Sequence, residues 1–248
     1  MRPETAGSDG TIDLWLFDLE PPLPDVHGFE RLLSGDERTR AAAFVFDEDR
    51  NRYIAGRGRL REILAHYLRL PPQDIRFTYN EYGKPGLDTG LHGVLHFNLS
   101  HSASLALLAV SDRYSLGADI EQEAPLKEDV AAYCFSDAER SDLAALSQDE
   151  YLNGFYRCWT RKEAFVKAHG KGLSLPLQSF DVSIGTEAMP LLKRLDSDPS
   201  GLRNWKLFNL APAPGFAGAL AVLTGGRNSR LQWRSLEELY AVSRASSM

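Results

Sequence analysis

Two stretches of this chain share a pattern in which Phe-Asn-Leu precedes a loop and then an apolar run. The first copy begins at Phe97 and continues into residues 105–111, and the second begins at Phe208 and continues into residues 219–224. Such a recurrence predicts two related structural units, although two β-hairpins can also share the pattern by chance. A chain of 248 residues is long enough for two small lobes, each with its own core. We therefore expect an α+β fold, a pseudo-twofold duplication of two similar α/β lobes at residues 1–114 and 115–248.

Hydrophobic periodicity and turn residues predict the individual elements. Helices are expected at residues 31–46, 49–70, 136–146 and 147–168, and strands at residues 12–19, 94–99, 105–111, 116–121, 180–184, 205–210, 218–224 and 231–236. The polar turn at Asp112 predicts a hairpin between the two strands that flank it. Ser100-His101-Ser102 falls between two strands, where the second copy has Ala211-Pro212. This difference predicts a ligand at the first turn.

Charge and cysteine content argue against several classes of protein. The formal net charge of −6 disfavours a general nucleic-acid binder. No apolar run approaches the ~20 residues that a membrane helix needs, and residues 1–10 lack the apolar centre of a signal peptide. The two cysteines, without metal-type spacing, fit free thiols in a reducing compartment. We expect a cytoplasmic protein that binds neither nucleic acid nor membranes, and a monomer, because the two lobes are already fused.

A predicted helix and a predicted strand carry three carboxylates that suit one metal site. Glu163 and Lys167 are four residues apart, so they lie one turn apart on the same helix face. Asp119 and Glu121 are two residues apart, so they point to the same side of a strand. Each pair has an ordinary alternative, as a surface salt bridge or as a solvated strand face. If the three carboxylates converge, their oxygens suit Mg²⁺ or Mn²⁺ rather than Zn²⁺.

Several cations are candidates for binding a phosphate-rich ligand beside that metal. Lys84 lies in a glycine- and proline-rich loop, Arg52 begins the long helix, and Arg40 precedes it. Taken singly, each is better explained as an ordinary charged surface residue. The sequence has no Gly-x-Ser-x-Gly motif and no Walker loop. The residues alone thus predict a Mg²⁺-dependent protein that acts on a phosphorylated, nucleotide-like molecule by direct transfer.

The chain resembles the Sfp-type 4′-phosphopantetheinyl transferases, the large two-lobed class. The matching motifs follow the family's order over roughly residues 30–182: Gly83-Lys84-Pro85, Phe97-Asn98-Leu99-Ser100-His101-Ser102, Leu116-Gly117-Ala118-Asp119-Ile120-Glu121, Phe135-Ser136 with Glu139, and Trp159 to Lys167 followed by Gly170-Lys171-Gly172-Leu173. The combination is specific, whereas the last third of the chain matches only loosely. The resemblance implies a pseudodimer of α/β lobes with coenzyme A in the cleft between them.

The resemblance also implies roles for individual residues. The Mg²⁺ ligands would be Asp119, Glu121 and Glu163. Lys167 would neutralise the diphosphate of coenzyme A, and Glu163, or a water that it orients, would be the catalytic base. The coenzyme would be bound at its 3′-phosphate side by Arg52, His101 and Arg40, and around its nucleotide by Lys84, Ser100 and the backbone of Gly83 to Pro85.

One position departs from the family pattern. Glu37 stands where the family often has a basic residue, and Arg38 is the candidate substitute. The basic end of the coenzyme pocket is therefore the part of the site that the resemblance defines least.

The implied reaction moves the 4′-phosphopantetheine group from coenzyme A to a serine of an apo acyl or peptidyl carrier protein and releases 3′,5′-ADP. Two alternatives stay open. One is a catalytically inactive module that binds coenzyme A or a carrier protein, and the other is a Mg²⁺-dependent phosphohydrolase that acts on nucleotides. The presence of all three carboxylates and of Lys167 argues against the inactive module.

Overall fold

The computed structural model describes residues 10–88, 90–91, 93–126 and 130–240. The helices are α1 (Leu23–Glu30), α2 (Gly35–Ala42), α3 (Asp47–Leu68), α4 (Val130–Cys134), α5 (Asp137–Ala144) and α6 (Gln148–His169). The strands are β1 (Thr11–Asp18), β2 (Phe77–Tyr79), β3 (Pro85–Leu87), β4 (His96–Ser102), β5 (Leu105–Ser111), β6 (Leu116–Gln122), β7 (Phe180–Val182), β8 (Leu192–Leu195), β9 (Trp205–Leu210), β10 (Phe216–Leu223) and β11 (Arg230–Arg234).

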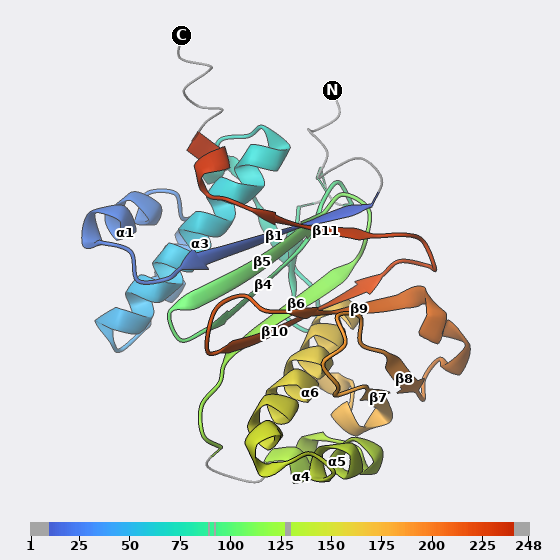
Figure 1. The fold of residues 1–248 in the computed structure, drawn as a ribbon. Helices are drawn as coiled ribbons and strands as arrows, with labels where there is room; N and C mark the ends of the chain where they lie inside the picture. Colours follow the sequence, from blue (N-terminus) through green and yellow to red (C-terminus); the bar gives the residue numbers. More distant parts are fainter. Residues whose placement is uncertain (1–9, 89, 92, 127–129, 241–248) are drawn as a thin grey trace.

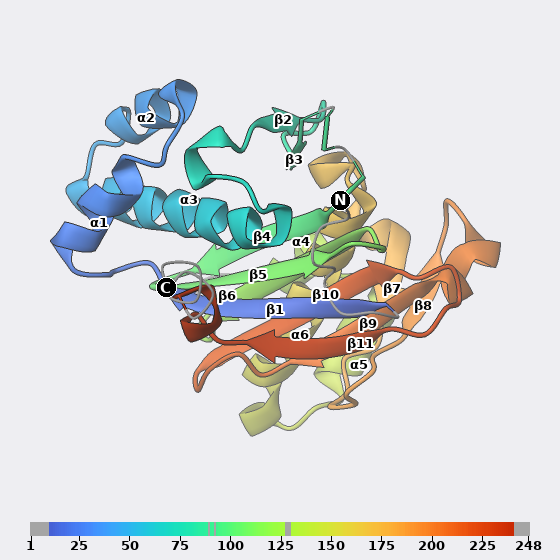
Figure 2. The same ribbon diagram turned by 90° about the horizontal axis from the view of Figure 1, so that it is seen from above.

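The two larger sheets and the two long helices form the layers of the molecule. The first sheet has the strand order β11-β1-β5-β4, and the second has the order β6-β10-β9. One apolar core, around Trp15 and Leu64, joins the first sheet to α3, and another, around Phe165 and Ala219, joins the second sheet to α6. A third core, around Ile12, joins the two sheets to each other. The helices α3 and α6 therefore lie on opposite sides of the stacked sheets (Figure 1; Figure 2).

The expected duplication is confirmed by the order and pairing of the elements. The series β1, α2, α3, β2–β3, β4 and β5 recurs as β6, α5, α6, β7–β8, β9 and β10. The orders β1-β5-β4 and β6-β10-β9 are equivalent, and every pairing within them is antiparallel. Both α3 and α6 span 22 residues, and each is followed by a residue in the left-handed conformation, Arg69 or Gly170.

The strand β11 has no counterpart in this series. It pairs in parallel with β1, although it follows the last strand of the second sheet in the sequence. An ion pair between Arg234 Nε and Asp13 Oδ1, at 3.0 Å, adds to this pairing, and Asp13 is fully buried. The first sheet therefore contains one strand from the end of the chain.

The helix predicted at residues 31–46 is too long, because only α2 (Gly35–Ala42) forms there, and Ser34 begins it with a capping box to Glu37. The helix α1 ends at Glu30 and was not predicted. Pro24 lies in the first turn of α1, where the missing N–H costs no hydrogen bond.

The predicted hairpin between residues 105–111 and 116–121 is also wrong. The strand β5 pairs with β1 and β4, whereas β6 pairs with β10 in the other sheet. Both strands are almost entirely buried, so neither has the solvated face of a two-stranded surface ribbon. In addition, Ser100, His101 and Ser102 belong to β4 itself, and the turn that follows lies at Ala103 and Ser104.

Gly117 allows β6 to lie directly against α6. A Cβ atom at this position would lie 2.2 Å from Ala168 N and 2.3 Å from Ala164 O, which are backbone atoms of the helix. No rotamer change relieves such a contact, so we expect Gly117→Ala to lower the free energy of unfolding by about 1–3 kcal/mol or more. Urea denaturation measures the change. Gly35→Ala is the matched control, because a Cβ there has no atom within 4 Å; equal stability of the two variants would contradict the prediction.

Candidate active site

Three elements bring Asp119, Lys167 and Ser100 together. Asp119 comes from β6 and is 1% exposed, Lys167 comes from α6, and Ser100 comes from β4. Lys167 Nζ donates to Asp119 Oδ1 at 2.5 Å and to Ser100 Oγ at 2.8 Å, and Ser100 Oγ donates to the same carboxylate oxygen at 2.9 Å. The two site elements predicted from sequence, the strand and the helix, therefore do meet.

The second oxygen of Asp119 is unsatisfied. Asp119 Oδ2 is buried and has no hydrogen-bond partner within the described parts of the chain. Burial raises the pKa of Asp119 to about 6, although the charge of Lys167 acts in the opposite direction. Buried carboxylate oxygens are rarely left without a partner. This atom is therefore a candidate ligand for a cation.

Glu121 is held by two residues for which no catalytic role was predicted. Its Oε2 accepts a hydrogen bond from Ser102 Oγ at 2.8 Å, and its Oε1 accepts one from Trp159 Nε1 at 3.3 Å. The indole of Trp159 also stacks on Phe155, with ring centroids 6.3 Å apart. The position of Ser102 two residues after Ser100 is the signal that would have placed both hydroxyls on the face of β4 that meets β6.

Glu163 lines a cavity of about 250 Å³ together with Lys84 and Lys167. Its carboxylate makes no hydrogen bond or ion pair with any residue that the structure describes. Burial is the largest influence on this group and raises the pKa of Glu163, while Lys167 opposes the shift and Glu121 adds to it. Glu163 is thus an acceptor that is open to a ligand.

The chemistry and surroundings of the three carboxylates decide whether they suit a metal ion. The described residues contain no group of three His, Cys, Asp or Glu side chains close enough together to hold a metal ion. The charge of Glu121 nevertheless raises the pKa of both Asp119 and Glu163, which places the three groups within electrostatic reach. The unsatisfied Asp119 Oδ2 and the open Glu163 carboxylate are hard oxygen donors, the type of ligand that Mg²⁺ and Mn²⁺ prefer.

A larger cavity, of about 560 Å³, adjoins the first. Arg40, Arg52 and His101 line it, and Gly83 and Pro85 line both cavities. Arg40 lies over the ring of Tyr53 with its guanidinium carbon 5.5 Å from the ring centre. Arg52 pairs with Glu20 and Glu48. Loss of solvent is the main cause of the lowered pKa of His101, and Lys167 lowers it further.

Two of the predicted coenzyme-binding residues make structural bonds. Lys84 Nζ donates to the backbone carbonyls of Lys167, at 2.7 Å, and Leu116, at 3.2 Å, so it ties the loop before β3 to the end of α6. Burial lowers the pKa of Lys84 to about 8. Its side chain still lines the smaller cavity. Ser100 is 5% exposed and lies beneath the site, where it lines neither of the two cavities.

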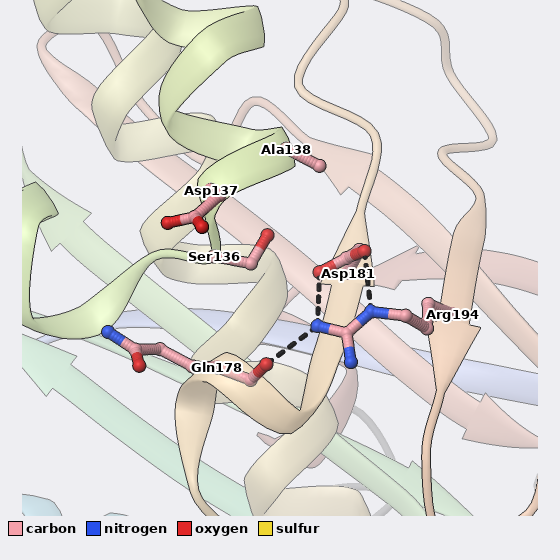
Figure 3. Close-up of a pocket in the computed structure, with 6 residues that line it drawn as sticks. All are labelled: Ser136, Asp137, Ala138, Gln178, Asp181 and Arg194. Carbon is pink, nitrogen blue, oxygen red and sulfur yellow. Dashed lines mark hydrogen bonds and ion pairs between the residues drawn. The ribbon is translucent and has the colours of Figure 1, made fainter.

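The second lobe contains a separate pocket of about 310 Å³, between α5 and the strands β7 and β8 (Figure 3). Its main charges neutralise each other, because Arg194 donates to both carboxylate oxygens of Asp181, at 2.8 and 2.9 Å. Arg194 also donates to the Gln178 carbonyl at 2.6 Å. This pocket shares no lining residue with the two cavities above, so we do not assign it to the active site.

Comparison with known proteins identifies the family. The model described as "4′-phosphopantetheinyl transferase superfamily" matches residues 115–221, and the model described as "4′-phosphopantetheinyl transferase, N-terminal" matches residues 20–113. The chain is 36% identical to 4′-phosphopantetheinyl transferase HetI of Nostoc sp., over 85% of this chain and 87% of that protein. It is 37% identical to 4′-phosphopantetheinyl transferase Sfp of Bacillus subtilis, over 68% and 74% of the two chains. The chain therefore belongs to the 4′-phosphopantetheinyl transferase family.

Proposed function

We propose that this protein transfers the 4′-phosphopantetheine group of coenzyme A to a serine of an apo acyl or peptidyl carrier protein, with Mg²⁺ as the cofactor and Mn²⁺ as a substitute. Membership of the family supports the transferase activity. The observation that carries the finer proposal is the buried, unsatisfied Asp119 Oδ2 beside Lys167, which lines the smaller of the two adjoining cavities. The volumes of the two cavities suit a ligand of nucleotide size.

The proposed roles follow the positions of the side chains. Arg40, Arg52 and His101 would bind the 3′-phosphate side of coenzyme A, and Arg52 would then exchange a carboxylate partner for the phosphate. The backbone of Gly83 to Pro85 would contact adenine, and Lys84 would hold this loop against α6. Lys167 would neutralise the diphosphate. Asp119, Glu121 and Glu163 would hold the metal, which supplies charge stabilisation of the diphosphate when bound.

The proposed step is a direct phosphoryl-type transfer. The serine oxygen of the carrier attacks the β-phosphorus, a new P–O bond forms, and the bond from that phosphorus to the bridging oxygen breaks. The bridging oxygen leaves as part of 3′,5′-ADP. Glu163, or a water that it orients, takes the serine proton. The burial that raises the pKa of Glu163 also makes its carboxylate a better base.

We further propose that residues 1–114 and 115–248 form two lobes around this site. The strand β11 belongs to the second range but pairs with β1 in the first sheet. Residues 1–9 and 241–248 lie outside the described residues. The smaller cavity supports the proposal, because Lys84 and Asn98 from the first half of the chain line it together with Glu163 from the second half.

We also propose that the protein is a cytoplasmic monomer. The free thiols of Cys134 and Cys158 fit a reducing compartment, and the two lobes are already fused in one chain. Among the described helices, none has the length and hydropathy required to span a bilayer.

The test is a panel of apo carrier proteins from fatty-acid, polyketide and nonribosomal-peptide systems, each incubated with coenzyme A and Mg²⁺ and then weighed by mass spectrometry. The expected result is a mass gain of one phosphopantetheine group that a metal chelator prevents. Coenzyme A binding without a mass gain in any carrier would favour a binding module. Release of 3′,5′-ADP at the same rate with and without a carrier would favour a phosphohydrolase.

Glu163→Gln keeps the volume of the side chain and removes its charge. We expect kcat for transfer to fall by roughly 10²–10⁴-fold, because both the base and one metal ligand are weakened. Single-turnover assays of carrier mass measure the rate. Glu150→Gln is the matched control, since Glu150 lies in the exposed first turn of the same helix. Near-wild-type activity of Glu163→Gln would remove Glu163 as the base.

A further inference from the structure

Both lobes use a buried glutamate to fix a short helix to a long one. Glu37 accepts a hydrogen bond from the backbone N–H of Ser34 at 3.0 Å, and Glu139 accepts one from that of Ser136 at 2.9 Å. Glu37 Oε2 lies 2.7 Å from Arg61 Nε, and Glu139 Oε2 lies 2.6 Å from Lys162 Nζ. Both cations stand fourteen residues after the first residue of their helices, α3 and α6. The two anchors are therefore equivalent.

The anchor of the first lobe contains a second cation. Arg57 Nε donates to Glu37 Oε1 at 2.8 Å, while Glu37 Oε2 is taken by Arg61. The position in α6 that corresponds to Arg57 is held by Cys158, which is fully buried. One cation thus suffices to neutralise the glutamate of the second lobe. In the first lobe, Glu37, Arg57 and Arg61 together carry a formal charge of +1. The anchor does not require this additional positive charge.

The surplus charge lies at the wall of the larger cavity. Arg57 lines that cavity, whereas Arg61 donates to the carbonyls of Pro72 and Ile75 and does not line it. The guanidinium of Arg57 is fixed on three sides, by Glu37, by the Tyr79 hydroxyl at 3.2 Å, and by the Phe77 ring, whose centre is 4.4 Å away. Its Nη1 has no hydrogen-bond partner among the residues described. A desolvated guanidinium of this kind is suited to an oxyanion, and above all to a phosphate.

We propose that Arg57 binds the terminal phosphate monoester of the ligand and that Glu37 is the residue that positions it. This inference rests on the proposed function and assigns two further residues to it. The monoester is favoured over the diphosphate because Arg57 shares its cavity with Arg40 and Arg52, whereas Lys167 lines the other cavity. The cation beside Glu37 comes from α3, because Arg38, the next residue in the chain, donates to the carbonyl of Leu33.

The test compares binding of coenzyme A and of 3′-dephospho-coenzyme A by titration calorimetry. In Arg57→Gln, affinity for coenzyme A is expected to fall roughly ten- to hundredfold, and affinity for the dephosphorylated compound is expected to change by less than about twofold. Arg59→Gln is the control, because it removes one charge from the same helix at a residue that pairs with Glu62 and lines neither cavity. It should bind both ligands as the wild type does.

Three results would overturn the inference. The first is an equal loss of affinity for both ligands in Arg57→Gln, and the second is no loss of affinity for either ligand. The third is a wild-type protein that binds the two ligands with equal affinity. None of these alone excludes the transferase, which the carrier assay tests separately. Glu37→Gln tests whether Glu37 positions Arg57. At a temperature well below the unfolding temperature of this variant, the ratio of its affinities for coenzyme A and 3′-dephospho-coenzyme A should be lower than in the wild type. If its preference stays at the wild-type value, Glu37 stabilises the fold only.

Discussion

Asp119→Ala is expected to abolish transfer to every carrier protein while the protein stays folded. The substitution removes the unsatisfied Oδ2 and also removes the carboxylate that pairs with Lys167. Loss of one metal ligand should cost several kcal/mol of transition-state stabilisation, which corresponds to roughly a thousandfold or more in kcat. The carrier mass assay measures the rate, and thermal unfolding measures the fold.

Asp119→Asn separates the catalytic role of this carboxylate from its effect on stability. The pKa of Asp119 is raised by burial from 3.8 to about 6. A raised pKa means that the folded protein holds the proton more tightly than the unfolded chain does. The stabilisation is therefore complete below about pH 4 and is lost as pH rises through about 6, and the total is at most about 3 kcal/mol.

The Asp119→Asn substitution removes the negative charge, so the free-energy cost of burying an ionised carboxylate at neutral pH should disappear. We expect Asp119→Asn to be inactive, to be at least as stable as the wild type at pH 7, and to lack the decline in stability between about pH 4 and pH 6. Urea denaturation over this pH range, without divalent metal, measures the difference. A variant that is both inactive and strongly destabilised at pH 7 would assign Asp119 to the fold and not to the chemistry.

Much of the architecture is predictable from sequence because the two halves repeat the same local signals. The Phe-Asn-Leu repeat corresponds to β4 with β5 and to β9 with β10, and these pairs occupy equivalent places in the two sheets. The sequence analysis paired β5 and β6 wrongly, because a strand that is buried on both faces does not indicate which strand lies beside it.

The site was predictable only where neighbours in sequence share an element. The spacing of Glu163 and Lys167 and that of Asp119 and Glu121 placed each pair on one face, and Lys167 does contact Asp119. Contacts between elements gave no such signal. The bonds from Lys84 to the backbone of α6, and the group formed by Glu37 with Arg57, depend on tertiary packing.

The duplication also raises the question of why the larger cavity lies in the first lobe and has no counterpart against α6 among the cavities described above. In the second lobe, two arginines of α6 turn toward the segment that follows β7. Arg161 donates to the carbonyls of Ser183, at 2.6 Å, and Gly185, at 2.7 Å, and Arg157 donates to that of Ile184 at 2.9 Å. The corresponding positions of α3 are Leu60 and Gly56, and both line the larger cavity. Long side chains thus fill in one lobe the space that small or apolar ones leave open in the other.

Lys162→Met tests the anchor that the two lobes share. Lys162 is fully buried, and its Nζ donates to Glu139 Oε1 at 2.7 Å and to Oε2 at 2.6 Å. The substitution leaves the buried Glu139 carboxylate without a counter-charge, so we expect a loss of about 3–5 kcal/mol in the free energy of unfolding by urea. Lys193→Met is the matched control. Lys193 pairs with Asp142 at a similar 2.8 Å, but both side chains are more than 40% exposed, so its loss should cost no more than about 1 kcal/mol. The two ion pairs have similar distances, so a difference in the loss of unfolding free energy reports the effect of burial. Similar losses of unfolding free energy in the two variants would contradict the role of Lys162 as an anchor.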